Sequence, residues 1–160
     1  MQNNAAAHTG PEGSGTSHFF YTTSGGRLAS FIKGDKDRYY KQQSITISGG
    51  FTIDTKKKTP ISAIGYMLSD DSQLRVYYVA MDGKLKELCW SKSKGYFPGA
   101  LSKKNYVVAD ASGLAASVDK GLIEVYCKLE KYDDSYARIW LSDPKTETWN
   151  DETLVQSDLY

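Results

Sequence analysis

Three segments of the chain repeat one layout, and this repetition constrains the fold more than any other feature of the sequence. Each segment has an aromatic or β-branched strand, a polar turn and a second strand. Successive copies are offset by 57 and then by 49 to 50 residues. A repeat near this length with about four strands per unit is typical of β-propeller blades, and a β-sandwich with accidental similarity is the alternative. The segments are HFFYTTSGGRLASFIK (18–33), LRVYYVAMDGKLKELCW (74–90) and IEVYCKLEKYDDSYARIW (123–140).

Helix signals are nearly absent, whereas short strand signals bounded by Gly, Asp, Ser and Pro recur from residue 18 to residue 154. The sequence therefore predicts an all-β fold, a β-propeller of four-stranded antiparallel blades that occupies residues 17–160. About three blades are expected, near 17–55, 60–108 and 110–154, with only three strands in the first. The Ala-, Gly- and Ser-rich residues 1–16 are expected to form a flexible N-terminal tail.

Three blades are fewer than the four to eight typical of propellers, so the chain is expected to associate. The simplest closed arrangement is a twofold homodimer, a six-bladed ring made from two chains. The segment LVQSDLY (154–160) is left over after the third blade and is a possible closing strand for a first blade.

The second repeat raises a question of register, because its two strands carry Arg75 and Glu87. These residues are 12 apart, so only a turn with an odd number of residues puts both on one face. A two-residue turn at Asp82-Gly83 separates them. A three-residue loop, Met81-Asp82-Gly83 with a left-handed glycine, makes them diagonal neighbours.

If both residues lie on the same face, the Arg75–Glu87 pair would form a polar clamp in a cleft that the neighbouring blade otherwise covers. Arg offers a rigid fork of donors and Glu offers acceptors, which together suit adjacent hydroxyl groups of a sugar. An aromatic wall from the next blade would cover the apolar patch of the sugar ring. The alternative is a salt bridge that only orients two blades.

The second repeat, LRVYYVAMDGKLKELCWSKSKGYFPGAL (74–101), resembles the blades of the fungal fucose-specific lectins, which are six-bladed propellers with the pattern (I/L)RVYY…DG.L.EL.W…G..G.L. The resemblance implies that Arg75 and Glu87 hold fucose or a fucosylated glycan, with Trp140 or Trp149 of the third blade as the aromatic wall. It implies no cofactor. At the corresponding positions the first repeat has His18 and Ser30, and the third has Glu124 and Ala137. We therefore expect at most one such site per chain, of low affinity by itself, so that avidity depends on dimerisation.

Other functional classes find little support in the sequence. It has no nucleotide-binding or hydrolase motif and no Cys/His cluster with metal-ligand spacing, so we expect neither an enzyme nor a metal site. A net charge of +1 disfavours nucleic acid as a partner, and no apolar run is long enough to insert into a membrane. No signal peptide is visible and the compartment stays unknown.

Two choices stay open. Cys89 and Cys127 are expected to be buried free thiols rather than a disulfide. The competing function is a protein-interaction propeller that has lost sugar binding. An acidic partner would then contact the run Lys56–Lys58 and the spread lysines at 84, 86, 92, 94, 103 and 104. The simpler interpretation is that these lysines are solvated and protect strand edges.

Overall fold

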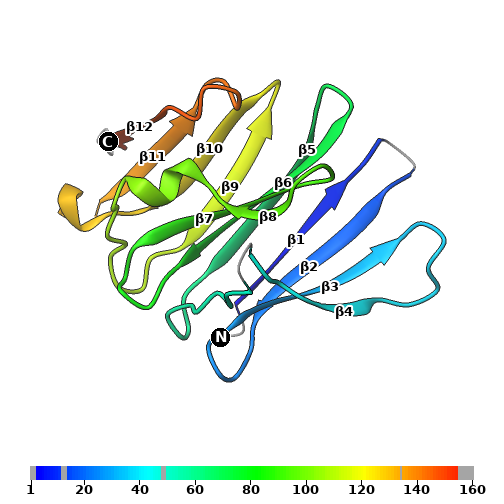
Figure 1. Ribbon diagram of the computed structural model, residues 1–160. Coiled ribbons are helices and arrows are strands. Elements are labelled where there is room, and N and C mark those ends of the chain that lie inside the picture. Colours follow the sequence, from blue (N-terminus) through cyan, green and yellow to red (C-terminus); the bar gives the residue numbers. More distant parts are fainter. Residues whose placement is uncertain (1–2, 12–13, 48–49, 134, 155–160) are drawn as a thin grey trace, which may run out of the picture.

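A computed structural model describes residues 3–11, 14–47, 50–133 and 135–154. Within these residues twelve strands form three four-stranded antiparallel sheets, each a meander of consecutive strands (Figure 1). The first sheet contains β1 (Asn4–Thr9), β2 (Thr16–Thr22), β3 (Leu28–Gly34) and β4 (Lys41–Ser44). The second contains β5 (Ile61–Leu68), β6 (Asp71–Val79), β7 (Leu85–Ser91) and β8 (Gly95–Pro98). The third contains β9 (Leu114–Asp119), β10 (Leu122–Lys128), β11 (Tyr136–Leu141) and β12 (Trp149–Thr153).

Two short 3-10 helices complete the described secondary structure. The helix η1 (Ala100–Lys103) follows β8, and η2 (Glu130–Tyr132) lies between β10 and β11. The strand β8 ends at Pro98, a residue that cannot donate a ladder hydrogen bond, and η1 begins two residues later. The all-β prediction and its four-stranded antiparallel units are confirmed.

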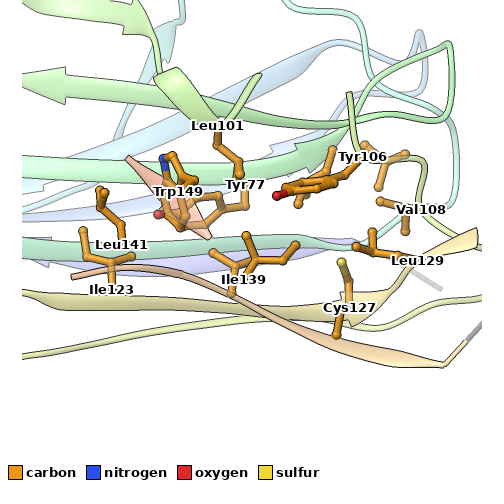
Figure 2. Packing of buried hydrophobic residues seen from close by; sticks show 14 of the residues in the cluster. Tyr77, Leu101, Tyr106, Val108, Ile123, Cys127, Leu129, Ile139, Leu141 and Trp149 are labelled. Atoms are coloured by element: carbon orange, nitrogen blue, oxygen red, sulfur yellow. The ribbon is translucent and has the colours of Figure 1, made fainter. Parts of the chain in front are cut away.

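The second sheet lies between the other two, and β1, β5 and β9 lie side by side where the sheets converge (Figure 1). We call the face of a sheet that is turned toward the next sheet in the chain its front face, and the opposite face its back face. The front face of the first sheet packs on the back face of the second around Phe20, Leu74, Val76 and Leu88. The front face of the second packs on the back face of the third in a larger apolar core, part of which Figure 2 shows.

The prediction of a flexible tail over residues 1–16 is wrong for Asn4–Thr9, which form β1 and pair with β2. The first sheet therefore has four strands rather than three. Ala5 and Ala7 pack on the apolar core, and the backbone of His8 lies so close to Gly65 of β5 that a Cβ atom there would overlap it. Alanine carries little of the alternating hydrophobicity that marks a strand, which explains why the pattern missed this one.

The possible closing strand at 154–160 falls mostly outside the described residues, so this hypothesis remains a prediction. Both cysteines are buried and free, as expected. Within the described residues, no helix has the length and hydropathy needed to cross a membrane. In the same part of the chain no cluster of three or more His, Cys, Asp or Glu side chains could hold a metal ion.

Candidate functional site

The hairpin of β6 and β7 has the three-residue loop. The N–H of Ala80 donates to the carbonyl of Lys84 over 2.9 Å, and Gly83 has a left-handed φ of 79°. This loop sets the register: Tyr77 lies opposite Glu87, and Arg75 lies opposite Cys89. All four side chains therefore belong to the front face of the second sheet, as the three-residue alternative requires.

Arg75 and Glu87 form a buried ion pair on that face. Arg75 Nη1 lies 2.5 Å from Glu87 Oε1, and the two side chains are 7% and 0% exposed. Arg75 Nε donates a second hydrogen bond, of 2.8 Å, to the hydroxyl of Tyr66 on β5. Among the hydrogen bonds found in the described part of the chain, Nη2 makes none. The guanidinium therefore has unused donors beside two fixed contacts.

The Glu87 carboxylate is held from behind by the segment that follows β8. The N–H of Leu101 donates to Glu87 Oε2 over 3.1 Å, and the N–H of Gly99 donates to the Glu87 carbonyl over 2.8 Å. A Cβ atom on Gly99 would overlap the carboxylate itself. The glycine and leucine of the G..G.L pattern thus position the glutamate.

The buried position of this site shifts the pKa values of the ionisable groups in it. Desolvation, reinforced by the Glu87 carboxylate, raises the pKa of Cys89 to about 12 and the pKa of Tyr77 well above its usual value. Desolvation by itself would lower the pKa of Arg75, but Glu87 and weaker neighbours outweigh it and raise that pKa. Arg75 therefore stays charged and Cys89 stays a neutral thiol at physiological pH.

The structure separates the two tryptophans that were candidates for the aromatic wall. Trp149 lies in the cleft between the second and third sheets, 1% exposed, with its ring centroid 6.1 Å from that of Tyr77 in an edge-to-face contact (Figure 2). The Tyr77 hydroxyl and Trp149 Nε1 are both buried without a hydrogen-bond partner in the described residues.

Trp140 is on the opposite face. It pairs with Glu124 on the front face of the third sheet and stacks with Arg138, whose guanidinium carbon lies 4.9 Å from the centroid of its ring. The expectation that Trp140 lines the same site as Arg75 is therefore wrong, because side chains alternate across a strand and the third sheet separates the two.

A pocket of about 430 Å³ opens where the second and third sheets meet, and neither Arg75 nor Glu87 belongs to its lining. Tyr66 lines it, and the hydroxyl of the same residue accepts the Arg75 hydrogen bond, so this tyrosine links the pocket to the guanidinium. Tyr66, Gly99 and Leu101 are not among the site residues that the sequence predicts; the end of the repeat pattern, G..G.L, was the available signal for Gly99 and Leu101. The third sheet contributes Val118, Lys120, Gly121 and Pro144 to the pocket.

The corresponding position in the first sheet is closed. His18 is 4% exposed, stacks on Phe20 and lies beside Trp90, and its Nε2 is 3.0 Å from Thr9 Oγ1. Burial, with a smaller contribution from the charge of His8, lowers the pKa of His18 to about 4. This neutral imidazole does not replace the charged fork of an arginine.

The register of the third sheet corrects one equivalence. Tyr126 lies opposite Arg138, as Tyr77 lies opposite Glu87, so the glutamate position of this sheet is Arg138 and not Ala137. The loop between its strands is longer, which shifted the alignment by one residue. Arg138 Nε donates to Glu124 Oε1 over 2.6 Å. The third sheet therefore keeps the ion pair with its two charges exchanged.

Comparisons with known proteins agree with this architecture. The model of the fungal fucose-specific lectin family matches residues 35–156. A fucose lectin from Kordia zhangzhouensis, solved in complex with methyl-fucoside, superposes with a TM-score of 0.67 at 20% identity, over 96% of this chain and 100% of its own. The six-bladed β-propeller lectin of Aleuria aurantia gives a TM-score of 0.73 at 20% identity, over 95% of this chain and 48% of its own. No curated protein matches by sequence.

The chain thus has about the length of the Kordia lectin and spans about half of the Aleuria lectin. Its three sheets have the fold of propeller blades. The match to the family model, over residues 35–156, extends beyond the second repeat on both sides. The chain belongs to the fungal fucose-specific lectin family.

Proposed function

We propose that this chain is a lectin that binds fucose, or the terminal fucose of a glycan, in the cleft between its second and third sheets. The observation that carries the proposal is the fixed Arg75–Glu87 pair, whose guanidinium keeps unused donors and donates a hydrogen bond to Tyr66, a residue that lines a pocket of about 430 Å³. Family membership disfavours the alternative of an interaction module that has lost sugar binding.

The chemistry of the residues supports this assignment. The Arg75 fork donates to sugar hydroxyls, the Tyr66 hydroxyl both donates and accepts, and Glu87 keeps the fork oriented. Trp149 adds an apolar aromatic surface to the interior of the same cleft, where it is buried against Tyr77. Because the ion pair itself is almost fully buried, only the outer edge of the guanidinium reaches a ligand, which favours a terminal monosaccharide over the middle of a glycan chain.

Titration calorimetry with methyl α-L-fucoside tests the proposal. The unmodified chain is expected to bind weakly. Tyr66→Phe, which removes the hydroxyl that fixes Arg75 Nε, is expected to lower affinity by about 10-fold, the value of one lost hydrogen bond to a charged group. Arg27→Ala, which removes an exposed arginine far from the cleft, is the matched control and is expected to bind normally.

Variants of the pair itself need a check on folding, because removing one member leaves the other buried and unpaired. The double variant Arg75→Met with Glu87→Leu removes both charges at nearly constant volume and is expected to remain folded by circular dichroism while losing fucoside binding. If this double variant binds the fucoside as tightly as the unmodified chain, the site is elsewhere and the assignment fails.

One site of this kind is weak by itself, so function at a glycan-coated surface requires more than one site per particle. We infer that the chain acts as a homodimer, a six-bladed ring that presents two such clefts. The half-length match to the six-bladed Aleuria lectin supports this inference.

A further inference from the structure

Within the described residues, Lys120 is the one charged residue in the lining of the pocket between the second and third sheets. The rest of the lining consists of Tyr66, a glycine and four apolar residues. Lys120 itself is exposed, so its ammonium group stands at the edge of the pocket rather than in a buried position. A mostly apolar pocket with a single cation at its edge favours a ligand that has both an apolar patch and a negative charge.

A tight turn holds the backbone of Lys120. The hairpin of β9 and β10 ends on the pair Asp119 and Leu122, so Lys120 and Gly121 are the two residues of its loop. Both have left-handed φ angles, of 46° and 90°, as in a type I′ hairpin turn. A Cβ atom on Gly121 would lie 3.9 Å from Pro144, so the connection between β11 and β12 is close to the turn. The lysine side chain therefore starts from a fixed position beside the pocket.

The neighbouring carboxylates do not neutralise this lysine. Its ammonium group forms no salt bridge within the described part of the chain. Asp119 lies on the front face of the third sheet, which is turned away from the second sheet. Asp143 accepts a backbone N–H of its own connection over 2.8 Å, and Asp71 accepts a serine hydroxyl of the β7–β8 turn over 3.0 Å. Glu147 is exposed and does not line the pocket. The charge of Lys120 is therefore free to meet a ligand.

The corresponding turn of the second sheet has the opposite charge. The hairpin of β5 and β6 ends on the pair Leu68 and Asp71, so its loop is Ser69-Asp70, and Asp70 is exposed. This turn belongs to the sheet that covers the first sheet, where the buried His18 closes the site. An aspartate thus stands at the turn beside the closed site, and a lysine stands at the turn beside the pocket. A cation at this turn is therefore not a general requirement of the blade fold.

We propose that Lys120 extends the fucose site to an anionic group on the sugar next to the fucose, so that the chain prefers fucosylated glycans that carry a sulfate or a carboxylate there. This assignment rests on the proposed function, because the fucose belongs to the side of the pocket that Tyr66 joins to Arg75. Sulfate and carboxylate share the chemistry that the ammonium group recognises, which is a set of charged oxygen acceptors. The pocket volume of about 430 Å³ is within the usual range of small-molecule sites.

Titration calorimetry with three glycans that share one terminal fucose tests the proposal. They are Lewis x, which is neutral, sulfated Lewis x and sialyl Lewis x. The unmodified chain is expected to bind at least one charged glycan about 3- to 10-fold more tightly than Lewis x, the range for one partly solvated charged contact. A preference for the sulfated glycan alone assigns the group to a sulfate, and a preference for the sialylated glycan alone assigns it to a carboxylate.

The ratio of the neutral to the charged dissociation constant is the readout for the variants, because general damage to the site cancels from it. Lys120→Gln keeps most of the side-chain length without the charge and is expected to bring this ratio to about 1, whereas Lys120→Arg is expected to keep the preference. Lys145→Gln is the matched control, since it removes an exposed lysine of the neighbouring connection that does not line the pocket. Raising NaCl from about 50 mM to about 500 mM is expected to reduce the preference of the unmodified chain.

The outcomes separate this proposal from the fucose site itself. Equal affinity of the unmodified chain for all three glycans overturns the role of Lys120 and leaves the fucose site standing. A preference that persists in Lys120→Gln, or that Lys145→Gln abolishes as well, also overturns that role. Binding of a charged glycan by the double variant Arg75→Met with Glu87→Leu would show that the anion is held without the fucose, which contradicts the extension. Absence of binding by all three glycans refutes both the fucose site and its extension.

Discussion

The Glu87 carboxylate has little freedom, because it is fixed by Arg75 on one side and by the N–H of Leu101 on the other, and the missing side chain of Gly99 leaves the space it occupies. Gly99 has ordinary extended backbone angles, so it is not needed for its conformational freedom. The requirement is for space: any Cβ atom would displace a buried charge from its partner.

Gly99→Ala is therefore expected to lower the free energy of unfolding by about 2–4 kcal/mol and to abolish fucoside binding, because overpacking and a disturbed ion pair act together. Urea unfolding followed by fluorescence measures the first effect. Gly25→Ala is the matched control, since its nearest neighbour would be 3.8 Å away, and a change within about 0.5 kcal/mol is expected. Equal stability of the two variants would contradict the role given to Gly99.

His18 makes the stability of the first two sheets depend on pH. Its pKa is lowered to about 4 by burial, below the 6.5 of the unfolded chain, so the unfolded state binds more protons between these values. The contribution of the neutral imidazole to the free energy of unfolding is thus fully present above pH 6.5 and is lost as the pH falls toward 4. The loss is expected to reach about 3 kcal/mol, and His18→Phe is expected to flatten this part of a denaturation-against-pH profile.

At the scale of single elements, the sequence specified the hairpin of β6 and β7 more fully than any other part. The Asp82-Gly83 turn limited the register to two choices, and the alternation of the strands made the three-residue loop the one that joins Arg75 and Glu87. The first strand, in contrast, had no such signal. Ala5 and Ala7 form strand because β2 and β5 provide ladder partners and an apolar surface, which is a tertiary effect.

Gly65→Ala is expected to push β1 away from β5, because the new methyl group would overlap the carbonyl of His8. Hydrogen exchange should then show faster exchange at the amides of β1, and the free energy of unfolding should fall by about 1–3 kcal/mol. Gly113→Ala is the control, since it is exposed and its nearest neighbour would be 4.0 Å away. Unchanged protection of β1 in Gly65→Ala would show that this contact does not hold the strand.

For the whole molecule, the proposed ring links assembly to glycan binding through the number of clefts per particle. Phe31→Asp places a charge on the outer face of the first sheet, where a second chain would close the ring, and is expected to give single chains. It leaves the Arg75 cleft intact, so its affinity for methyl α-L-fucoside is expected to equal that of the unmodified chain. Its retention on a densely fucosylated surface is expected to fall by about 100-fold, since a monomer loses the effective concentration that a second cleft provides. Surface plasmon resonance at high ligand density measures this, and equal retention of monomer and dimer would contradict the link.

The sequence by itself determined the all-β class, the three repeats and the hairpin, and it limited the register of Arg75 and Glu87 to two choices, because strand alternation and turn chemistry are local properties. Only the tertiary structure decided which tryptophan shares the cleft, since one residue of register moves a side chain to the other face of a sheet, and Trp149 rather than Trp140 faces the second sheet. The same one-residue shift put Arg138 in place of Ala137 and revealed the exchanged ion pair. Register across a loop of uncertain length depends on the packing of whole sheets, which no local pattern of residues contains.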